Sequence, residues 1–226
     1  TVSDAIDRTD DNPFQAFKAY LPQAYPAIYS RLDTLTINEY GLVFRWPGKN
    51  PALPPILLCS HYDVVPVLNY DPSAPDAPLP GWDYPPFSGA VADGRIYGRG
   101  TLDMKGMLFS ILEATDSLLA EGFRPERDVW IALGFDEETG GTQGALKIAR
   151  YFEEQGIAFD AVYDEGGIII APGLGGIQRT AALVGTAEKG FSTIRITVRG
   201  TGGHSSMPPE KGSLVLAAEI IEMLNQ

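Results

Sequence analysis

The segment Ile56-Leu57-Leu58-Cys59-Ser60-His61 decides the fold class. Its first four residues form a short apolar run, which is typical of a buried strand, and the run ends at polar Ser60 and His61. Comparable apolar segments occupy 128–135 and 161–163, and segments with helical spacing occupy 104–121 and 142–155. This alternation of strands and helices predicts an α/β fold with a mainly parallel sheet and flanking helices.

The flanking sequence predicts further elements and a domain boundary. A helix is expected from Pro13, one or two strands within 34–46, and mostly loop over 66–95. From about residue 187 the pattern changes: 191–199 alternates like a strand with one buried face, and a helix is expected from about Gly212. We therefore predict one domain over 1–186 and the beginning of a smaller α+β domain over 187–226.

Composition excludes several classes of protein. The chain has 226 residues, 29 of them acidic and 17 basic, for a net charge of −12. This balance argues against nucleic acid and anionic membranes as partners, and it suits a site that gathers carboxylates around cations. The single cysteine, Cys59, excludes an intrachain disulfide and a cysteine-based zinc finger, and we expect it in the core. The polar, acidic start does not resemble a signal peptide, so we expect a cytoplasmic location.

Polar residues with metal-binding side chains follow each predicted strand or precede a helix. Because ligands of α/β sheets bind beyond the carboxyl ends of strands, we expect these residues to converge. Clustered carboxylates repel one another unless a cation lies between them. One imidazole with several carboxylates suits zinc, or manganese or cobalt. The candidates are, in chain order, His61, Asp63, Asp103, Glu137, Glu138, Asp164 and Glu165.

Each candidate also has a structural explanation of its own. His61 could be a capping residue, Asp63 a turn residue and Asp103 a helix N-cap. The acidic pair after 128–135 could be solvated charge at a helix N-terminus, and Asp164 with Glu165 could form a plain turn. Four such positions at successive junctions favour a shared site. The sequence has neither a G-x-S-x-G nucleophile motif nor a G-x-x-x-x-G-K-[ST] phosphate loop.

Four motifs contain most of the candidates. They are His61-Tyr-Asp-Val-Val-Pro66, Tyr97-Gly-Arg-Gly-Thr-Leu-Asp-Met-Lys-Gly106, Asp136-Glu-Glu-Thr-Gly-Gly141 and Gly202-Gly-His-Ser-Ser-Met-Pro-Pro209. In order and spacing, these motifs resemble the M20 family of metallopeptidases, the aminoacylase and carboxypeptidase group. The segments 82–89, 164–167 and 187–190 are similar to the carboxypeptidase S and Gly-Xaa carboxypeptidase branch, which N-fatty-acyl-amino-acid hydrolases also resemble.

The resemblance implies a role for each candidate in a centre of two zinc ions. His61 would bind one ion, with Asp63 behind it holding its ring. Asp103 would bridge the two ions, Glu137 would be the general base, and Glu138 would bind the second ion. A further ligand would be Asp164 or Glu165, with Asp164 the preferred candidate.

The resemblance also implies a role for His204 and a further metal-binding histidine that this chain does not contain. His204 would lie on a lid domain and stabilise the oxyanion in a partner subunit, or it would simply shape a turn. The family's last ligand histidine lies in a C-terminal stretch, whereas both histidines of this chain are already assigned. We therefore expect an incomplete catalytic domain over 1–186 and the start of a lid or dimerisation domain over 187–226.

The expected function is hydrolysis of an amide bond next to a free carboxylate, in a dipeptide or an N-acyl amino acid. Water activated by the metals would attack the carbonyl, with Glu137 as base. A homodimer through the lid is the expected assembly. The alternatives are a non-catalytic metal-binding or dimerisation module and an inactive fragment of the enzyme.

Overall fold

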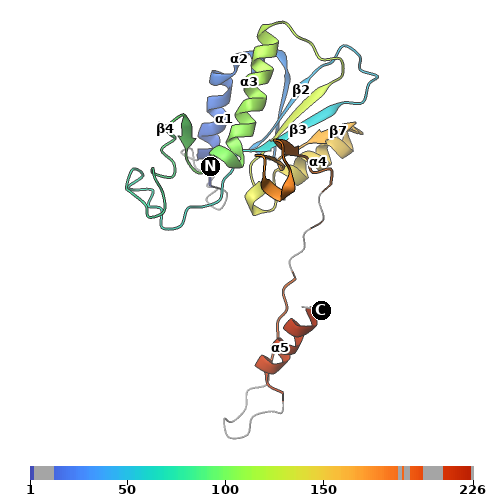
Figure 1. Cartoon of the computed structure of the whole chain (residues 1–226). Helices are drawn as coiled ribbons and strands as arrows, with labels where there is room; N and C mark the ends of the chain where they lie inside the picture. Colours follow the sequence, from blue (N-terminus) through green and yellow to red (C-terminus); the bar gives the residue numbers. More distant parts are fainter. Residues whose placement is uncertain (3–12, 188–189, 191–193, 201–210, 225–226) are drawn as a thin grey trace. The chain divides into compact units, whose positions relative to one another are not determined.

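The computed structural model describes residues 1–2, 13–187, 190, 194–200 and 211–224, which form two compact units (Figure 1). The units comprise Thr1–Gly167 and Ile168–Gln226. We describe each unit by itself, and the domain boundary near residue 187 stays a prediction. Among the described residues, no helix combines the length and the apolar character needed to cross a bilayer.

A five-stranded sheet forms the centre of the first unit. Strand β3 pairs in parallel with β6 and with β7, whereas β2 pairs antiparallel with β1 and β6. The predicted α/β class with a mainly parallel centre is therefore confirmed. In spatial order the strands are β1 (Asp33–Ile37), β2 (Gly41–Trp46), β6 (Val129–Gly134), β3 (Ile56–His61) and β7 (Ala161–Tyr163).

Helices cover both faces of this sheet (Figure 1). Alternating residues of β2 show the two layers: Leu42 and Phe44 belong to the core under α1, α2 and α3, while Val43 packs with Ile148 and Phe152 of α4. Fully burying a side chain of this size contributes about 1.5–3 kcal/mol, so both faces stabilise the sheet. The helices are α1 (Pro13–Ala24), α2 (Pro26–Arg31), α3 (Gly106–Ala120) and α4 (Ala145–Glu154).

The segment expected to be mostly loop contains one short hairpin. Strands β4 (Ala90–Ala92) and β5 (Arg95–Tyr97) pair antiparallel across Asp93 and Gly94, whose φ angles are 50° and 70°. Two consecutive positive φ angles are what a tight hairpin turn requires, and Asp-Gly supplies them at low cost. The hairpin leads directly into the turn that carries Asp103.

The second unit contains a hairpin and one helix. Strands β8 (Ile168–Ile170) and β9 (Ala181–Leu183) pair antiparallel, a short 3-10 turn spans Leu174–Gly176, and α5 covers Ser213–Leu224. The helix expected from about Gly212 is confirmed. The strand expected over 191–199 is wrong for 194–199, which have no regular structure, and 191–193 lie outside the described residues. An alternating pattern forms a strand only beside a partner strand, and no described residue pairs with this segment.

Candidate metal centre

The carboxyl ends of three neighbouring strands bring the candidate residues to one edge of the sheet. The chain runs from β3 through α3 to β6 on one side, and then through α4 to β7 on the other side of β3. Such a switch point is where α/β sheets bind ligands. At the end of β3 lies His61; after β6 come Glu137 and Glu138, and after β7 come Asp164 and Glu165.

Asp103 reaches this edge because α3 begins later than the sequence predicts. A turn over Thr101–Lys105 precedes the helix, and within it Asp103 (φ −114°, ψ 99°) and Met104 (φ −133°, ψ 34°) are not helical. The Met104 side chain is buried and anchors the turn, whereas the Asp103 side chain is 66% exposed. The N-cap position of α3 is Lys105. Reading Asp103 as an N-cap is therefore wrong.

Asp63 fixes the ring of His61. The His61 side chain is only 3% exposed, and its Nδ1 lies 3.1 Å from Oδ1 of the fully buried Asp63. A carboxylate in this position accepts the Nδ1 proton, so that Nε2 keeps its lone pair. The geometry directs Nε2 toward the edge of the sheet where the acidic side chains gather.

The same Asp63 carboxylate also fixes the segment that follows β6. The backbone N–H of Glu137 donates to Oδ1 and the N–H of Glu138 donates to Oδ2, each at 3.1 Å. Hydrogen bonds from N–H groups to a carboxylate are stronger than neutral ones. One buried side chain thus sets the position of the imidazole at the end of β3 and of the two acidic residues that follow β6.

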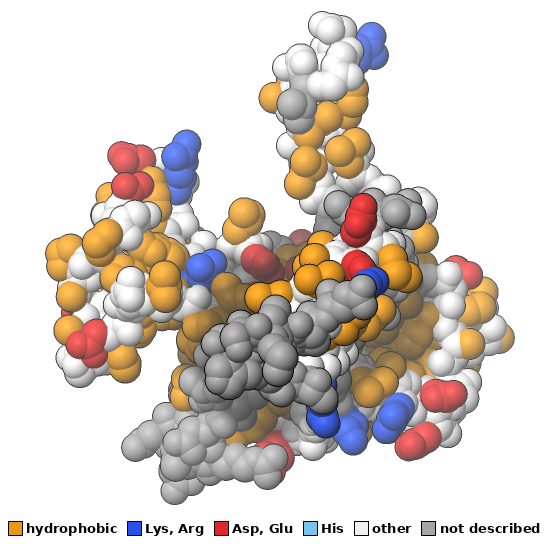
Figure 2. Space-filling view, turned by 90° about the horizontal axis from the view of Figure 1, so that it is seen from below, with side chains coloured by type: hydrophobic (Ala, Val, Ile, Leu, Met, Phe, Trp, Pro, Cys, Tyr) orange, Lys and Arg blue, Asp and Glu red, His pale blue; other side chains and the backbone are white. Residues whose placement is uncertain are grey.

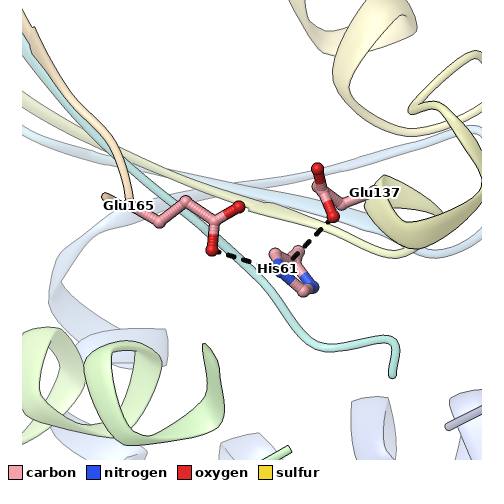
Figure 3. Close-up of side chains that lie close together, drawn as sticks. All are labelled: His61, Glu137 and Glu165. Atoms are coloured by element: carbon pink, nitrogen blue, oxygen red, sulfur yellow. Dashed lines mark ion pairs between the residues drawn. The ribbon is translucent and has the colours of Figure 1, made fainter. Parts of the chain in front are cut away.

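Carboxylate oxygens surround His61 Nε2 (Figure 3). Nε2 lies 3.2 Å from Asp103 Oδ1, 3.6 Å from Glu165 Oε2 and 3.7 Å from Glu137 Oε2. This atom is buried and forms no hydrogen bond within the described part of the chain. Two sets of ligand atoms each lie within 4.8 Å of one another: His61 with Glu137 and Glu165, and His61 with Asp103 and Glu138.

This arrangement fits a divalent cation. Burial, and then the charges of neighbouring acids, raise the pKa values of Glu137, Glu138 and Glu165. Burial lowers the pKa of His61, but the Asp63 hydrogen bond and the acidic neighbours outweigh it and raise this pKa to about 9. A bound cation would relieve the repulsion between the acids and use the lone pair of Nε2. An imidazole with carboxylates suits zinc, manganese or cobalt.

The two candidates after β7 differ in position. Glu165 contributes an oxygen to one ligand set, whereas Asp164 lines a cavity of about 610 Å³ together with His61 and Glu137. The Oδ1 of Asp164 accepts the backbone N–H of Glu165 at 2.9 Å. This geometry favours Glu165 over the sequence-based preference for Asp164, and the assignment of the ligand stays a prediction.

Cys59 lines the same cavity and is partly exposed, so the expected position in the core is only half right. Burial, with a smaller contribution from the Asp164 charge, raises the pKa of its thiol to about 12. The thiol therefore stays protonated at neutral pH and is a poor nucleophile. The remaining cavity wall is mostly apolar and comes from β3, β6, β7 and α4.

Asp136 fixes the far end of the loop that carries Glu137 and Glu138. Its buried carboxylate accepts the backbone N–H groups of Gln143 and Gly144, both at 2.7 Å, and its carbonyl accepts the N–H of Gly141 at 2.8 Å. A Cβ on Gly144 would lie 2.5 Å from Asp136 Oδ1, so the loop requires glycine there. This role of Asp136 was not predicted from the sequence. The pattern that could have indicated it is an acidic residue followed by Gly140-Gly141 and Gly144, which is typical of a tight loop closed by side-chain hydrogen bonds.

Lys105 is a second residue whose contribution the sequence analysis missed. Its Nζ donates to the carbonyl of Tyr62 at 2.7 Å and to Thr1 Oγ1 at 2.8 Å, directly behind the segment that carries His61 and Asp63. Burial lowers the pKa of Lys105 to about 8, against the opposing effect of the Asp63 and Glu138 charges. A cation next to this carboxylate cluster offsets part of its negative charge. The remaining candidate, His204, lies outside the described residues.

Sequence comparison assigns this site to a family. The profile of "Peptidase family M20/M25/M40" matches residues 57–225, which include every candidate residue. The chain belongs to peptidase family M20. The M20 chain is 39% identical over 224 residues to "Probable carboxypeptidase S-like 2" of Dictyostelium discoideum, covering 98% of this chain and 41% of that protein. It is 35% identical over 228 residues to "N-fatty-acyl-amino acid synthase/hydrolase PM20D1" of Homo sapiens, covering 100% and 43% respectively.

A solved structure shows the same fold. The M20 metallo-carboxypeptidase Sso-CP2 of Sulfolobus solfataricus aligns with a TM-score of 0.53 and 22% identity, covering 73% of this chain and 34% of that one. The chain thus spans about two-fifths of the length of the curated relatives it matches. The predicted membership of the M20 family is confirmed.

Proposed function

We propose that this M20 chain carries the metal-binding part of an amide hydrolase that cleaves next to a free carboxylate, in a dipeptide or an N-acyl amino acid. The observation that carries the proposal is the buried Nε2 of His61, which has no hydrogen bond to a described residue and faces carboxylate oxygens from three separate segments. The names of the relatives, a carboxypeptidase and an N-fatty-acyl-amino acid hydrolase, support this substrate class.

The residues present would hold two zinc ions. His61 with Glu165 or Asp164 would hold one ion and Glu138 the other. Asp103 would bridge them, because its oxygen lies within 4.8 Å of the ligand atoms of both His61 and Glu138. Two such ions polarise a carbonyl and make water more acidic. Manganese or cobalt would serve with the same ligands.

In the proposed reaction Glu137 moves the proton. It takes a proton from the attacking water and returns it to the leaving amine, so that the amide C–N bond breaks and a C–O bond forms. The raised pKa of Glu137 suits this role because a base of higher pKa accepts a proton more readily. Asp63 keeps the Glu137 backbone and the His61 ring in fixed positions throughout.

The test compares Glu137→Gln with Glu154→Gln, an exposed glutamate of α4, in the zinc-loaded gene product that contains this chain. We expect Glu137→Gln to keep its zinc by elemental analysis and to lose about 10²–10⁴-fold in turnover. Glu154→Gln should match the wild type. The substrates are a dipeptide and an N-acyl amino acid. The matched controls carry a C-terminal amide in place of the free carboxylate, and they should not be cleaved. Equal turnover of the two variants would contradict the role of Glu137, and absence of turnover in the wild type would support a metal-binding module without catalysis.

His204 is proposed to act in a partner subunit, on the basis of the family resemblance alone. Its loss should lower turnover by about 10²–10³-fold and leave the zinc content unchanged. Mixed dimers of His204→Ala and Glu137→Gln chains should regain part of the activity, since one site then holds both intact residues. Demonstrated mixed dimers without recovery would contradict a role in trans.

A further inference from the structure

A second cavity of the first unit lies apart from the candidate metal centre. Its volume is about 420 Å³, and none of the candidate metal ligands lines it. Its apolar wall includes Phe17 and Tyr20 of α1 and Phe87 of the loop before β4. Its polar wall holds two cations, Arg99 and Lys105, and no acidic side chain contributes to its described lining.

Arg99 has no anionic partner in the described part of the chain. Its Nε is buried without a hydrogen bond, and no described residue forms an ion pair with its guanidinium. The guanidinium instead lies over the ring of Trp82, 5.4 Å from the ring centroid. By contrast, Arg45 bonds to Asp128 at 2.8 Å. An unpaired guanidinium is unexpected in a chain with a net charge of −12.

The position of Arg99 is fixed by its own backbone and by its neighbours. Its N–H donates to the carbonyl of Pro86 at 2.7 Å, and its guanidinium lies over the ring of Trp82. Lys105 on the same wall is held by Tyr62 and adds a second positive charge. Partial burial of both cations costs free energy that an anion bound between apolar walls would offset.

We propose that this cavity binds a small carboxylate with an apolar body. The planar guanidinium of Arg99 pairs with the two carboxylate oxygens, Lys105 adds attraction as a point charge, and the aromatic rings contact the apolar body. The site is separate from the metal centre and does not depend on the proposed hydrolysis.

The test measures binding of 4-fluorobenzoate to the zinc-loaded chain by ¹⁹F NMR, with neutral 4-fluorobenzamide as the matched probe. We expect a dissociation constant of about 1 mM or below for a ligand of this size, and at least about tenfold weaker binding of the amide. Equal binding of the two probes would overturn the proposal. Removing zinc should leave the affinity for 4-fluorobenzoate unchanged, and loss of binding with the metal would place the probe at the metal centre instead.

Three variants locate the probe. Arg99→Gln should weaken binding at least about tenfold. Ala16→Glu adds an acid at a position that lines the cavity and leaves both cations in place, so it should abolish binding even if Arg99→Gln fails to fold. Ala19→Glu carries the same change on the same helix at an exposed residue outside the cavity lining, and it should bind normally. Normal binding by Ala16→Glu, or equal loss in Ala19→Glu, would overturn the proposal.

Discussion

Helices α3 and α5 are both rich in apolar residues, but their surroundings differ. In α3, Leu108, Leu112, Thr115 and Leu119 are buried against the sheet. In α5 no described residue is buried, and Leu214 is 86% exposed. Figure 2 shows that hydrophobic side chains are common on the surface of the described residues. Apolar periodicity thus predicts that a helix forms, whereas its burial depends on which elements pack against it.

The largest expected effect separates these two helices directly. Leu108→Ala should lower the free energy of unfolding by about 2–5 kcal/mol, because a fully buried side chain leaves a cavity. Leu214→Ala should change it by less than about 0.5 kcal/mol. Urea unfolding followed by circular dichroism measures both values. Similar losses in the two variants would mean that α5 packs as tightly as α3.

Zinc binding should stabilise the first unit and leave the second unit unchanged. In the proposed centre His61 is the only imidazole ligand and serves one of the two zinc ions, so this chain should bind one zinc ion tightly and the second weakly. At a free zinc concentration of 100 times the dissociation constant, the gain in stability is about 2.7 kcal/mol.

Hydrogen exchange should become slower on zinc binding in 61–64, 100–106 and 136–144, with the second unit unchanged. Two tight sites per chain in a zinc titration would contradict the expected difference in affinity between the two ions.

An acid-to-amide substitution in each unit tests how far the metal centre depends on buried support. Asp63→Asn should weaken zinc binding by about 10–100-fold, since an amide cannot accept from His61 and from both backbone N–H groups. Glu219→Gln, which removes an exposed ion pair with Lys211, should leave zinc affinity unchanged. Calorimetric titration gives both affinities. Equal affinities of the two variants would show that Asp63 does not support the site.

The last prediction concerns the protonation of His61. In the metal-free chain the pKa of His61 should be about 9, above its ordinary value of 6.5. Its contribution to stability is then complete below pH 6.5 and is lost as the pH rises through 9. NMR titration of the imidazole signals, assigned with His204→Ala, measures this value. Zinc should remove the titration of His61, and an ordinary pKa in the metal-free chain would contradict the described environment.

The sequence predicts the elements of the first unit well because strand and helix periods are local properties. The apolar run 56–59 became β3, and the segment 34–46, expected to hold one or two strands, contains most of β1 and all of β2. The convergence of His61, Glu137 and Glu165 was also predictable, since it follows from the positions of strand ends.

Other features depend on contacts between distant residues and escaped prediction. The turn before α3 rests on the buried Met104, and the support from Asp136 and Lys105 rests on backbone groups that lie close together only in the folded chain. The choice between Asp164 and Glu165 likewise depends on side-chain direction after β7, which a two-residue acidic pair does not encode.

Asp63 has a consequence for the mutational tolerance of this chain. One carboxylate serves an imidazole and two peptide groups, so three interactions are lost together when it changes. Redundant sites lose function gradually, whereas a shared anchor makes the loss abrupt and leaves few replacements open. In a library of all single substitutions, position 63 should therefore be among the least permissive, although its side chain lies behind the proposed metal ligands.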